Sequence, residues 1–136
     1  MSDLTQIARP VHRNIGITQI VRYRLPAAGI VSILHRASGA LLFLSLPFLL
    51  YLFNRSLTSE TSYAEFTAFV SGWFAKLVLC VLIWAYLHHL FAGLRHLVMD
   101  LNHGLEKHQA RGSAIAVFAI SLPLAAYLAL KLFGIL

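Results

Sequence analysis

The chain has 136 residues, of which 59% are hydrophobic and only 12% carry a charge. Soluble domains carry roughly 25% charged residues, so this composition excludes an ordinary soluble domain and indicates a membrane protein. The net charge of +6 does not indicate a nucleic-acid partner, because the basic residues flank apolar runs, and the single cysteine, Cys80, excludes an internal disulfide and a covalent c-type haem.

The N-terminal segment, residues 1–25, is predicted to be a polar, basic arm. Arg9-Pro10 and Gly16 disfavour a long regular helix within it. Pro26 suits the start of a helix, because its ring fixes φ near the helical value and the first N–H groups have no partner in any case. We therefore predict the first helix over about residues 26–53.

Two further helices are predicted over about residues 63–99 and 112–133. Like the first, each contains an uncharged run of about the 18 to 20 residues that a helix needs to cross ~30 Å of hydrocarbon. The expected fold is thus an all-α integral membrane protein with three transmembrane helices. Residues 1–136 leave no room for a second domain, so soluble chemistry must lie on another chain.

The basic residues are distributed unequally about these spans. One side has Arg9, Arg13, Arg22, Arg24, Arg95, Lys107 and Arg111, whereas the other has Arg55 and Lys131, with Lys76 a little inside the second span. The positive-inside rule then predicts a cytoplasmic N-terminus and a periplasmic C-terminus. The opening residues resemble neither a cleaved signal nor a transit peptide, so we expect a bacterial inner (cytoplasmic) membrane.

The first helix carries a polar stripe. Ser32, His35, Arg36 and Gly39 occupy positions i, i+3, i+4 and i+7, which lie along one side of a helix. Arg36 could simply extend to the headgroups, as basic side chains near helix ends do. Alternatively, the stripe suits an anionic group such as a haem propionate, and Ser32 and Arg36 provide the donors that a quinone carbonyl needs.

The second helix carries His89 and His96, seven residues apart, with Ala92 and Gly93 between them. Seven residues are close to two turns, so both rings project from one face and the small residues leave a groove for a flat cofactor. Such histidines can also serve only as interhelical hydrogen-bonding groups. His88 points about 100° away from His89 and is the weaker candidate for a ligand.

His89 and His96 cannot bind one iron together, because two turns separate them by ~10 Å along the helix axis. If a haem is present, the second axial ligand must come from another helix, which we expect on another chain. The polar stripe and the two histidines lie in the same half of the bilayer, so they can meet. Asp100 suits either a pairing with Arg95 or His96, or a proton relay.

These residues carry a family resemblance. The motifs are Arg9-Pro10, the run Ser32-Ile33-Leu34-His35-Arg36-Ala37-Ser38-Gly39, and the run His89-x3-Gly93-x-Arg95-His96-Leu97-x2-Asp100. With the three-helix layout, they resemble the cytochrome b556 family of membrane anchors of succinate dehydrogenase, which is respiratory complex II. The resemblance covers nearly the whole chain.

The resemblance implies that this chain and a second three-helix anchor subunit share one haem b, each supplying one axial histidine. The matching ligand here is His89, with His35, Arg36 and His96 near the propionates. Ubiquinone would be reduced close to an iron–sulfur subunit, with Ser32 and Arg36 as the matching contacts. A flavoprotein subunit would oxidise succinate, so no catalytic residue for that reaction is expected on this chain.

Three other functions remain to be weighed. A fumarate reductase anchor differs in the direction of turnover, which depends on the quinone and the partners. A proton-relay or transport component would use Arg36, His89 and His96 as an ion path, but it would be expected to have acidic residues within the spans. A purely structural membrane subunit would bind no cofactor.

Overall fold

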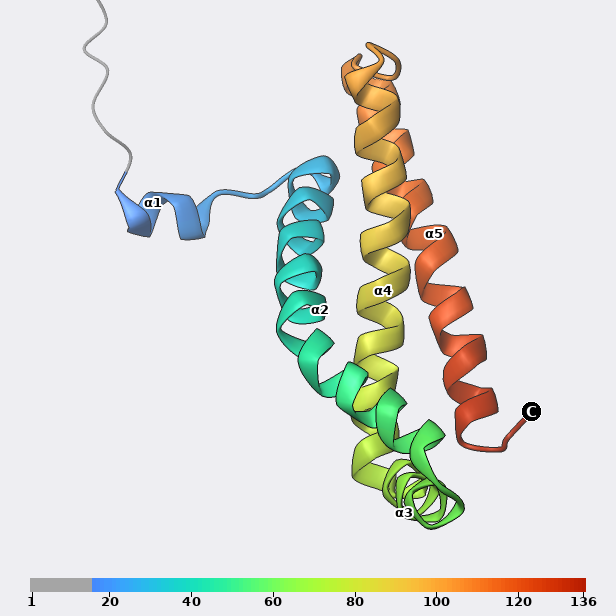
Figure 1. Ribbon diagram of the computed structural model, residues 1–136. Coiled ribbons are helices and arrows are strands. Elements are labelled where there is room, and N and C mark those ends of the chain that lie inside the picture. Colours follow the sequence, from blue (N-terminus) through green and yellow to red (C-terminus); the bar gives the residue numbers. More distant parts are fainter. Residues whose placement is uncertain (1–15) are drawn as a thin grey trace, which may run out of the picture.

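The computed structural model describes residues 16–136, which form five helices and no strand (Figure 1). The helices are α1 (Ile17–Arg22), α2 (Ala27–Thr58), α3 (Glu60–Ser71), α4 (Trp73–Asp100) and α5 (Lys107–Leu132). Of these, α2, α4 and α5 are long and apolar enough to cross a membrane. The predicted all-α fold with three membrane-crossing helices is therefore confirmed. The motif Arg9-Pro10 and Arg13 lie outside the described residues.

The first long helix continues beyond its predicted end at residue 53. Residues 54–58 are polar, but Ser56 and Thr58 donate hydrogen bonds to carbonyls of their own helix, at 2.7 and 2.8 Å. The turn that follows is a single residue, Ser59. Its hydroxyl accepts a hydrogen bond from the Ser62 N–H, and the Ser62 hydroxyl accepts one from the Ser59 N–H, which forms a capping box.

The second predicted helix, residues 63–99, is two helices in the structure, so the prediction of one continuous helix is wrong. Gly72 has an extended conformation, with φ −62° and ψ 142°, and separates α3 from α4. Figure 1 shows α3 lying across the end of the bundle. Glycine weakens a helix interior because the free chain has more conformations to lose, and this explains why the break occurs there.

The predicted turn at residues 102–104 does end α4. Asn102 adopts φ 61°, its N–H donates to the Met99 carbonyl, and the His103 N–H reaches back to the Val98 carbonyl at 3.4 Å. This is the Schellman arrangement. The last helix, α5, begins at Lys107, five residues before the predicted start at 112. The segment before the apolar run contains Lys, Gln, Ala and Arg, which favour a helix although most of them are polar.

The bundle is centred on α4, which contacts both α2 and α5. Its core consists of small and β-branched side chains that the structure buries together: Val31, Ala92, Ala114 and Val117. In lipid the hydrophobic effect does not drive helices together, so van der Waals packing has to hold them. Small side chains favour this packing because they let the helices approach closely. Most large apolar side chains instead face outward, as expected of helices long and apolar enough to cross a membrane.

Candidate functional site

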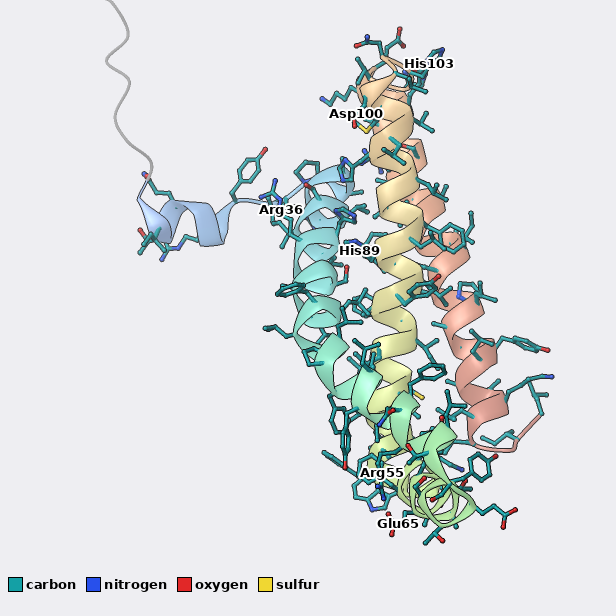
Figure 2. The ribbon with its side chains drawn as sticks, in the orientation of Figure 1. Arg36, Arg55, Glu65, His89, Asp100 and His103 are labelled. Carbon is teal, nitrogen blue, oxygen red and sulfur yellow. The ribbon has the colours of Figure 1, made fainter. Side chains whose placement is uncertain are left out.

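Three histidines from α2 and α4 lie together in the structure. The rings of His35 and His89 are stacked, with centroids 4.2 Å apart and planes within 8° of parallel. His96 is next to them, with its ring centroid 5.1 Å from that of His35. Figure 2 shows His89 projecting into the space between α2 and α4. The two polar sets predicted to share one half of the bilayer are therefore in direct contact.

His89 is held in one orientation by the backbone of α2. Its Nδ1 lies 3.0 Å from the carbonyl oxygen of His35 and 3.4 Å from the hydroxyl oxygen of Ser38. A carbonyl oxygen can only accept, so Nδ1 carries the proton and donates it in this hydrogen bond. In the neutral ring the lone pair is then on Nε2, which has no hydrogen-bond partner within residues 16–136.

Two glycines make this close approach possible. A Cβ added to Gly39 would lie 2.7 Å from Cε1 of His89, so only glycine leaves room for the ring against α2. A Cβ added to Gly93 would lie 3.4 Å from Nε2 of His35. The groove expected beside Gly93 is therefore filled by His35, and Ala92 is buried in the core. That groove is not open to a cofactor, because α2 covers it.

His88 faces away from this cluster. It is fully buried, with its ring stacked on Trp84 at 5.4 Å and next to Phe118 of α5 at the same centroid distance. Neither of its ring nitrogens has a hydrogen-bond partner among the described residues. Its surroundings leave no path to a flat cofactor, whereas His89 lies at the edge of the bundle's interior.

Ser32 and Arg36 flank the histidine cluster on α2. Ser32 is half-buried and Arg36 is exposed. Neither side chain forms a hydrogen bond or an ion pair with another residue of the described chain, so both keep their donors for an external group. Of the predicted stripe, His35 and Gly39 contact α4, whereas no hydrogen bond or ion pair joins Ser32 or Arg36 to the other candidate residues within the described chain.

Arg95 has a different role from the one its sequence neighbours suggested. It is only 8% exposed, and its Nε donates to the Ser113 hydroxyl at 2.9 Å while a terminal nitrogen donates to the Ala110 carbonyl at 3.3 Å. Arg95 therefore joins α4 to α5. The pairing of Asp100 with Arg95 or His96 does not occur, and Asp100 is exposed at the end of α4 (Figure 2).

Sequence reasoning missed two of the residues that shape the site. Ser38 lies against His89, and its hydroxyl also donates to the His35 carbonyl at 3.0 Å. Ser113 holds the buried guanidinium of Arg95. The spacing of Ser38, three residues after His35, could have indicated its hydrogen bond to the His35 carbonyl. Nothing in the spacing of residues 95 and 113 predicts the hydrogen bond between Arg95 and Ser113.

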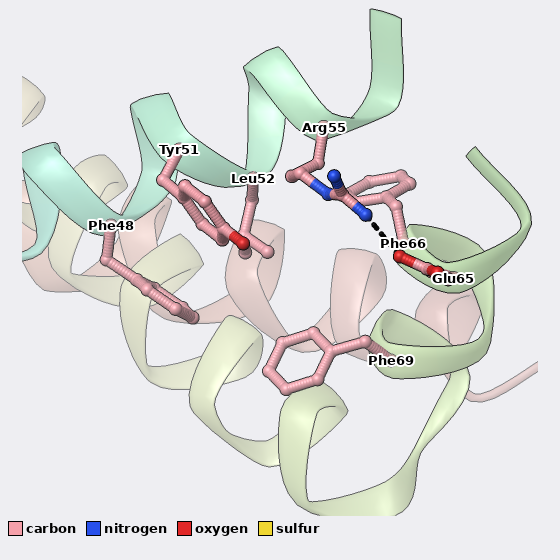
Figure 3. Close-up of a pocket in the computed structure, with 7 residues that line it drawn as sticks. All are labelled: Phe48, Tyr51, Leu52, Arg55, Glu65, Phe66 and Phe69. Carbon is pink, nitrogen blue, oxygen red and sulfur yellow. Dashed lines mark hydrogen bonds and ion pairs between the residues drawn. The ribbon is translucent and has the colours of Figure 1, made fainter. Parts of the chain in front are cut away.

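A cavity lies at the end of α2 that is far from the histidine cluster, where α3 packs against α2 (Figure 3). It has a volume of about 210 Å³ and is lined mainly by aromatic side chains of both helices, with the ion pair of Arg55 and Glu65 at its edge. None of the candidate site residues lines it. The contacts around it fix α3 across the end of the bundle.

A metal ion at His89 would need ligands from outside this chain. Across residues 16–136, no three His, Cys, Asp or Glu side chains are arranged to hold one. One free imidazole nitrogen, oriented through a backbone hydrogen bond, is instead what a histidine provides to a metal that a larger group already holds. The residues present thus fit a haem iron better than a bare ion.

Comparison with known proteins gives a consistent set of matches. The sequence pattern of the family described as "Succinate dehydrogenase/Fumarate reductase transmembrane subunit" matches residues 7–128. The chain is 39% identical over 115 residues to the succinate dehydrogenase cytochrome b556 subunit of Coxiella burnetii, covering 83% of this chain and 87% of the relative. It is 34% identical over 125 residues to that of Paracoccus denitrificans, covering 92% of each.

A third relative is the succinate dehydrogenase cytochrome b560 subunit of Reclinomonas americana. It is 33% identical over 105 residues, which cover 74% of this chain and 69% of the relative. The family match includes the whole of α2, α3 and α4 and most of α5. It therefore contains every residue of the histidine cluster.

Proposed function

Because the chain belongs to the succinate dehydrogenase/fumarate reductase transmembrane subunit family, as its motifs predicted, we propose that it is the haem b-binding anchor of a succinate:quinone oxidoreductase. Members of this family are subunits of an enzyme complex. We propose that succinate is oxidised on the partner chains of that complex. The role of this chain is to tether the flavoprotein and iron–sulfur subunits to the membrane and to help form the site where ubiquinone is reduced.

The observation that carries the haem proposal is the environment of His89. Its Nδ1–H donates to the His35 carbonyl, which fixes both the ring orientation and the position of the free lone pair on Nε2. A histidine that binds a metal usually donates its other ring N–H to a carbonyl or carboxylate, which makes it a better ligand. His89 would therefore hold the haem iron, and not His88, whose ring is enclosed by Trp84 and Phe118.

The charged and polar groups around His89 suit the rest of the cofactor. When bound, haem b would accept and pass on one electron at a time. His35, Arg36 and His96 supply donors beside the ring, where carboxylate propionates need them. A second protein ligand to the iron would come from a second anchor subunit, because His35 is stacked face to face with His89 and the two rings cannot both hold one iron between them.

Ser32 and Arg36 form the contribution of this chain to the quinone site. Their donors have no partner in the described structure, and together they present a hydroxyl and a guanidinium near the same end of α2 as His35. Hydrogen bonds from both to one quinone carbonyl would hold the headgroup. The charge of Arg36 would favour the oxygen as it gains negative charge during reduction.

The distribution of basic residues supports the direction of insertion. We propose that α1 and the loop between α4 and α5 face the cytoplasm, and that the C-terminus faces the periplasm of a bacterial inner membrane. This places the histidine cluster and Ser32 in the half of the bilayer nearest the soluble subunits. Electrons from the iron–sulfur subunit would then have a short path to the quinone.

The proposal is tested on the complex purified after expression of this chain with its partner subunits. We expect b-type Soret and α bands in the reduced-minus-oxidised spectrum, and reduction of a ubiquinone analogue by succinate. A complex that reduces quinone without any haem band contradicts the cofactor assignment. A complex that oxidises succinate only with a soluble artificial acceptor contradicts the quinone assignment.

A further inference from the structure

A groove separates the starts of α2 and α5, at the end of the bundle that also carries the α4–α5 loop. Its volume is about 590 Å³, which is within the range of about 300–1,000 Å³ typical of sites for small molecules. None of the residues assigned to haem or quinone lines it. The groove is therefore separate from the site described above.

The polar part of the lining is entirely basic. Arg24, Lys107 and Arg111 contribute three exposed cations, and no carboxylate of residues 16–136 lines the groove. The acidic residue nearest in sequence, Glu106, has its carboxylate 3.3 Å from Nδ1 of His108. Glu106 precedes Lys107 in the chain but does not line the groove, so the described lining keeps a net positive charge, which would attract an anion.

Two further features increase the positive potential at this place. Both helices begin here, neither has an acidic residue in its first turn after the N-cap, and the one acidic N-cap, Glu106 of α5, makes no capping hydrogen bond. In addition, the buried guanidinium of Arg95 is bonded to the carbonyl of Ala110, which lines the groove, and no carboxylate of the described chain pairs with it. Helix N-termini and buried cations both favour bound negative charge.

The rest of the lining is apolar. Leu25, Ala28 and Ile115 are among the side chains that form it, and Ile115 lies eight residues into α5, about 12 Å further along the helix than Lys107. The groove is thus basic where the helices start and apolar where they enter the membrane. A free phosphate would use only the first part.

We propose that this groove binds an anionic phospholipid. Its phosphate group would lie among Arg24, Lys107 and Arg111, and the start of one acyl chain would lie along Ala28 and Ile115. Only a ligand that is both anionic and apolar, and that lies at the membrane surface, complements the whole lining. The bound lipid would fill the space between α2 and α5 and fix the first turns of both helices.

The test uses the intact complex with a triple variant, Arg24→Gln, Lys107→Gln and Arg111→Gln. Each basic group near a membrane surface contributes roughly a factor of five to anionic-lipid binding, so losing three should lower affinity on the order of 100-fold. The matched control is Lys131→Gln, which removes a cation from the other end of α5. Complexes in nanodiscs of phosphatidylglycerol and phosphatidylcholine are released into detergent, and retained lipid is measured by native mass spectrometry.

We expect the native complex and Lys131→Gln to retain phosphatidylglycerol and the triple variant to lose it, with phosphatidylcholine retained by none of them. Equal retention by the native and triple-variant complexes would overturn the proposal. A photoreactive benzoylphenylalanine in place of Ile115 gives a second test that does not alter the charges. Cross-linking to the lipid supports the proposal, whereas cross-linking to another subunit means that protein covers the groove and overturns it.

Discussion

Two adjacent histidines illustrate how much a difference of one residue matters in a helix. His88 and His89 point about 100° apart, so one contacts α5 and the other contacts α2. His88 has apolar neighbours and no hydrogen bond, whereas His89 donates to a carbonyl and lies against a glycine. Only the second arrangement leaves one ring nitrogen oriented and available.

Gly39 is the residue whose substitution should most directly disturb His89. In Gly39→Ala the new Cβ would lie 2.7 Å from Cε1 of His89, so the ring or the helix must move. We expect a shifted α band and altered low-spin g-values of the haem in the intact complex, with a loss of stability of roughly 1–3 kcal/mol from overpacking. In Gly112→Ala, where no atom lies within 4 Å, the spectrum should stay unchanged and stability should not fall, because Ala favours a helix interior over Gly. An unaltered spectrum in Gly39→Ala would mean that His89 does not hold the haem in this orientation.

Ser32 and Arg36 should affect quinone reduction and not succinate oxidation. Removing the hydroxyl in Ser32→Ala costs one hydrogen bond of about 0.5–1.5 kcal/mol, so kcat/KM for the quinone should fall about two- to tenfold. Arg36→Leu should cost more, because a charge-assisted bond is lost. The measurement compares succinate–quinone activity with reduction of a soluble artificial acceptor.

The control for this comparison is Ser56→Ala, whose hydroxyl bonds only to the Phe53 carbonyl of its own helix. It should leave both activities unchanged. If Arg36→Leu reduces both activities equally, then Arg36 holds the subunits together, and its assignment to the quinone site must be withdrawn.

The candidate histidines could be predicted from the sequence, but their partners could not. The spacing of His35, His89 and His96, together with the positions of the predicted spans, is sufficient to place them in one half of the bilayer. The stacking of His35 on His89 and the contact with Ser38 depend on how α2 is rotated about its axis, which side-chain spacing leaves open. The same rotation determines that Gly93 faces His35 and not a cofactor.

At the scale of the helices, hydropathy predicts the spans well and their ends less well. The apolar runs gave α2, α4 and α5, since each must cross the same thickness of hydrocarbon. The extension of α2 through polar residues 54–58 and the break at Gly72 depend on local hydrogen bonds and backbone conformation. Neither leaves a strong trace in hydropathy, because polar residues near an interface are compatible with both helix and loop.

The junction between α4 and α5 includes one hydrogen bond between two side chains, Arg95 and Ser113. In Ser113→Ala the Nε–H of Arg95 loses its partner. Interhelical hydrogen bonds in membrane bundles contribute on average about 0.6 kcal/mol and at most about 1.7 kcal/mol, so we expect a loss of stability in that range. It is measured by thermal unfolding of the complex in detergent. Ser45→Ala, whose hydroxyl bonds only to the Leu41 carbonyl, is the control, and an equal effect of both variants would contradict this role.

The molecule as a whole exposes most of its large apolar side chains, including several on α2 and α4. In a membrane, lipid would cover some of this surface, and a second anchor subunit would cover the part next to His89. We therefore expect the chain expressed alone to bind haem poorly or with altered ligation. Electron paramagnetic resonance of the isolated chain checks this, and a clean low-spin bis-histidine signal would show that the second anchor is unnecessary.

The most direct test of the central claim compares His89→Leu with His88→Leu in the intact complex. Both variants replace an imidazole of the same helix by a side chain of similar size, but only His89 has the oriented, free ring nitrogen. The visible spectrum of the reduced complex is measured beside the amount of assembled complex. His89→Leu should weaken or shift the b-type bands, and His88→Leu should leave them intact. Intact bands in His89→Leu, together with their loss in His88→Leu, would contradict the assignment of His89 as the axial ligand.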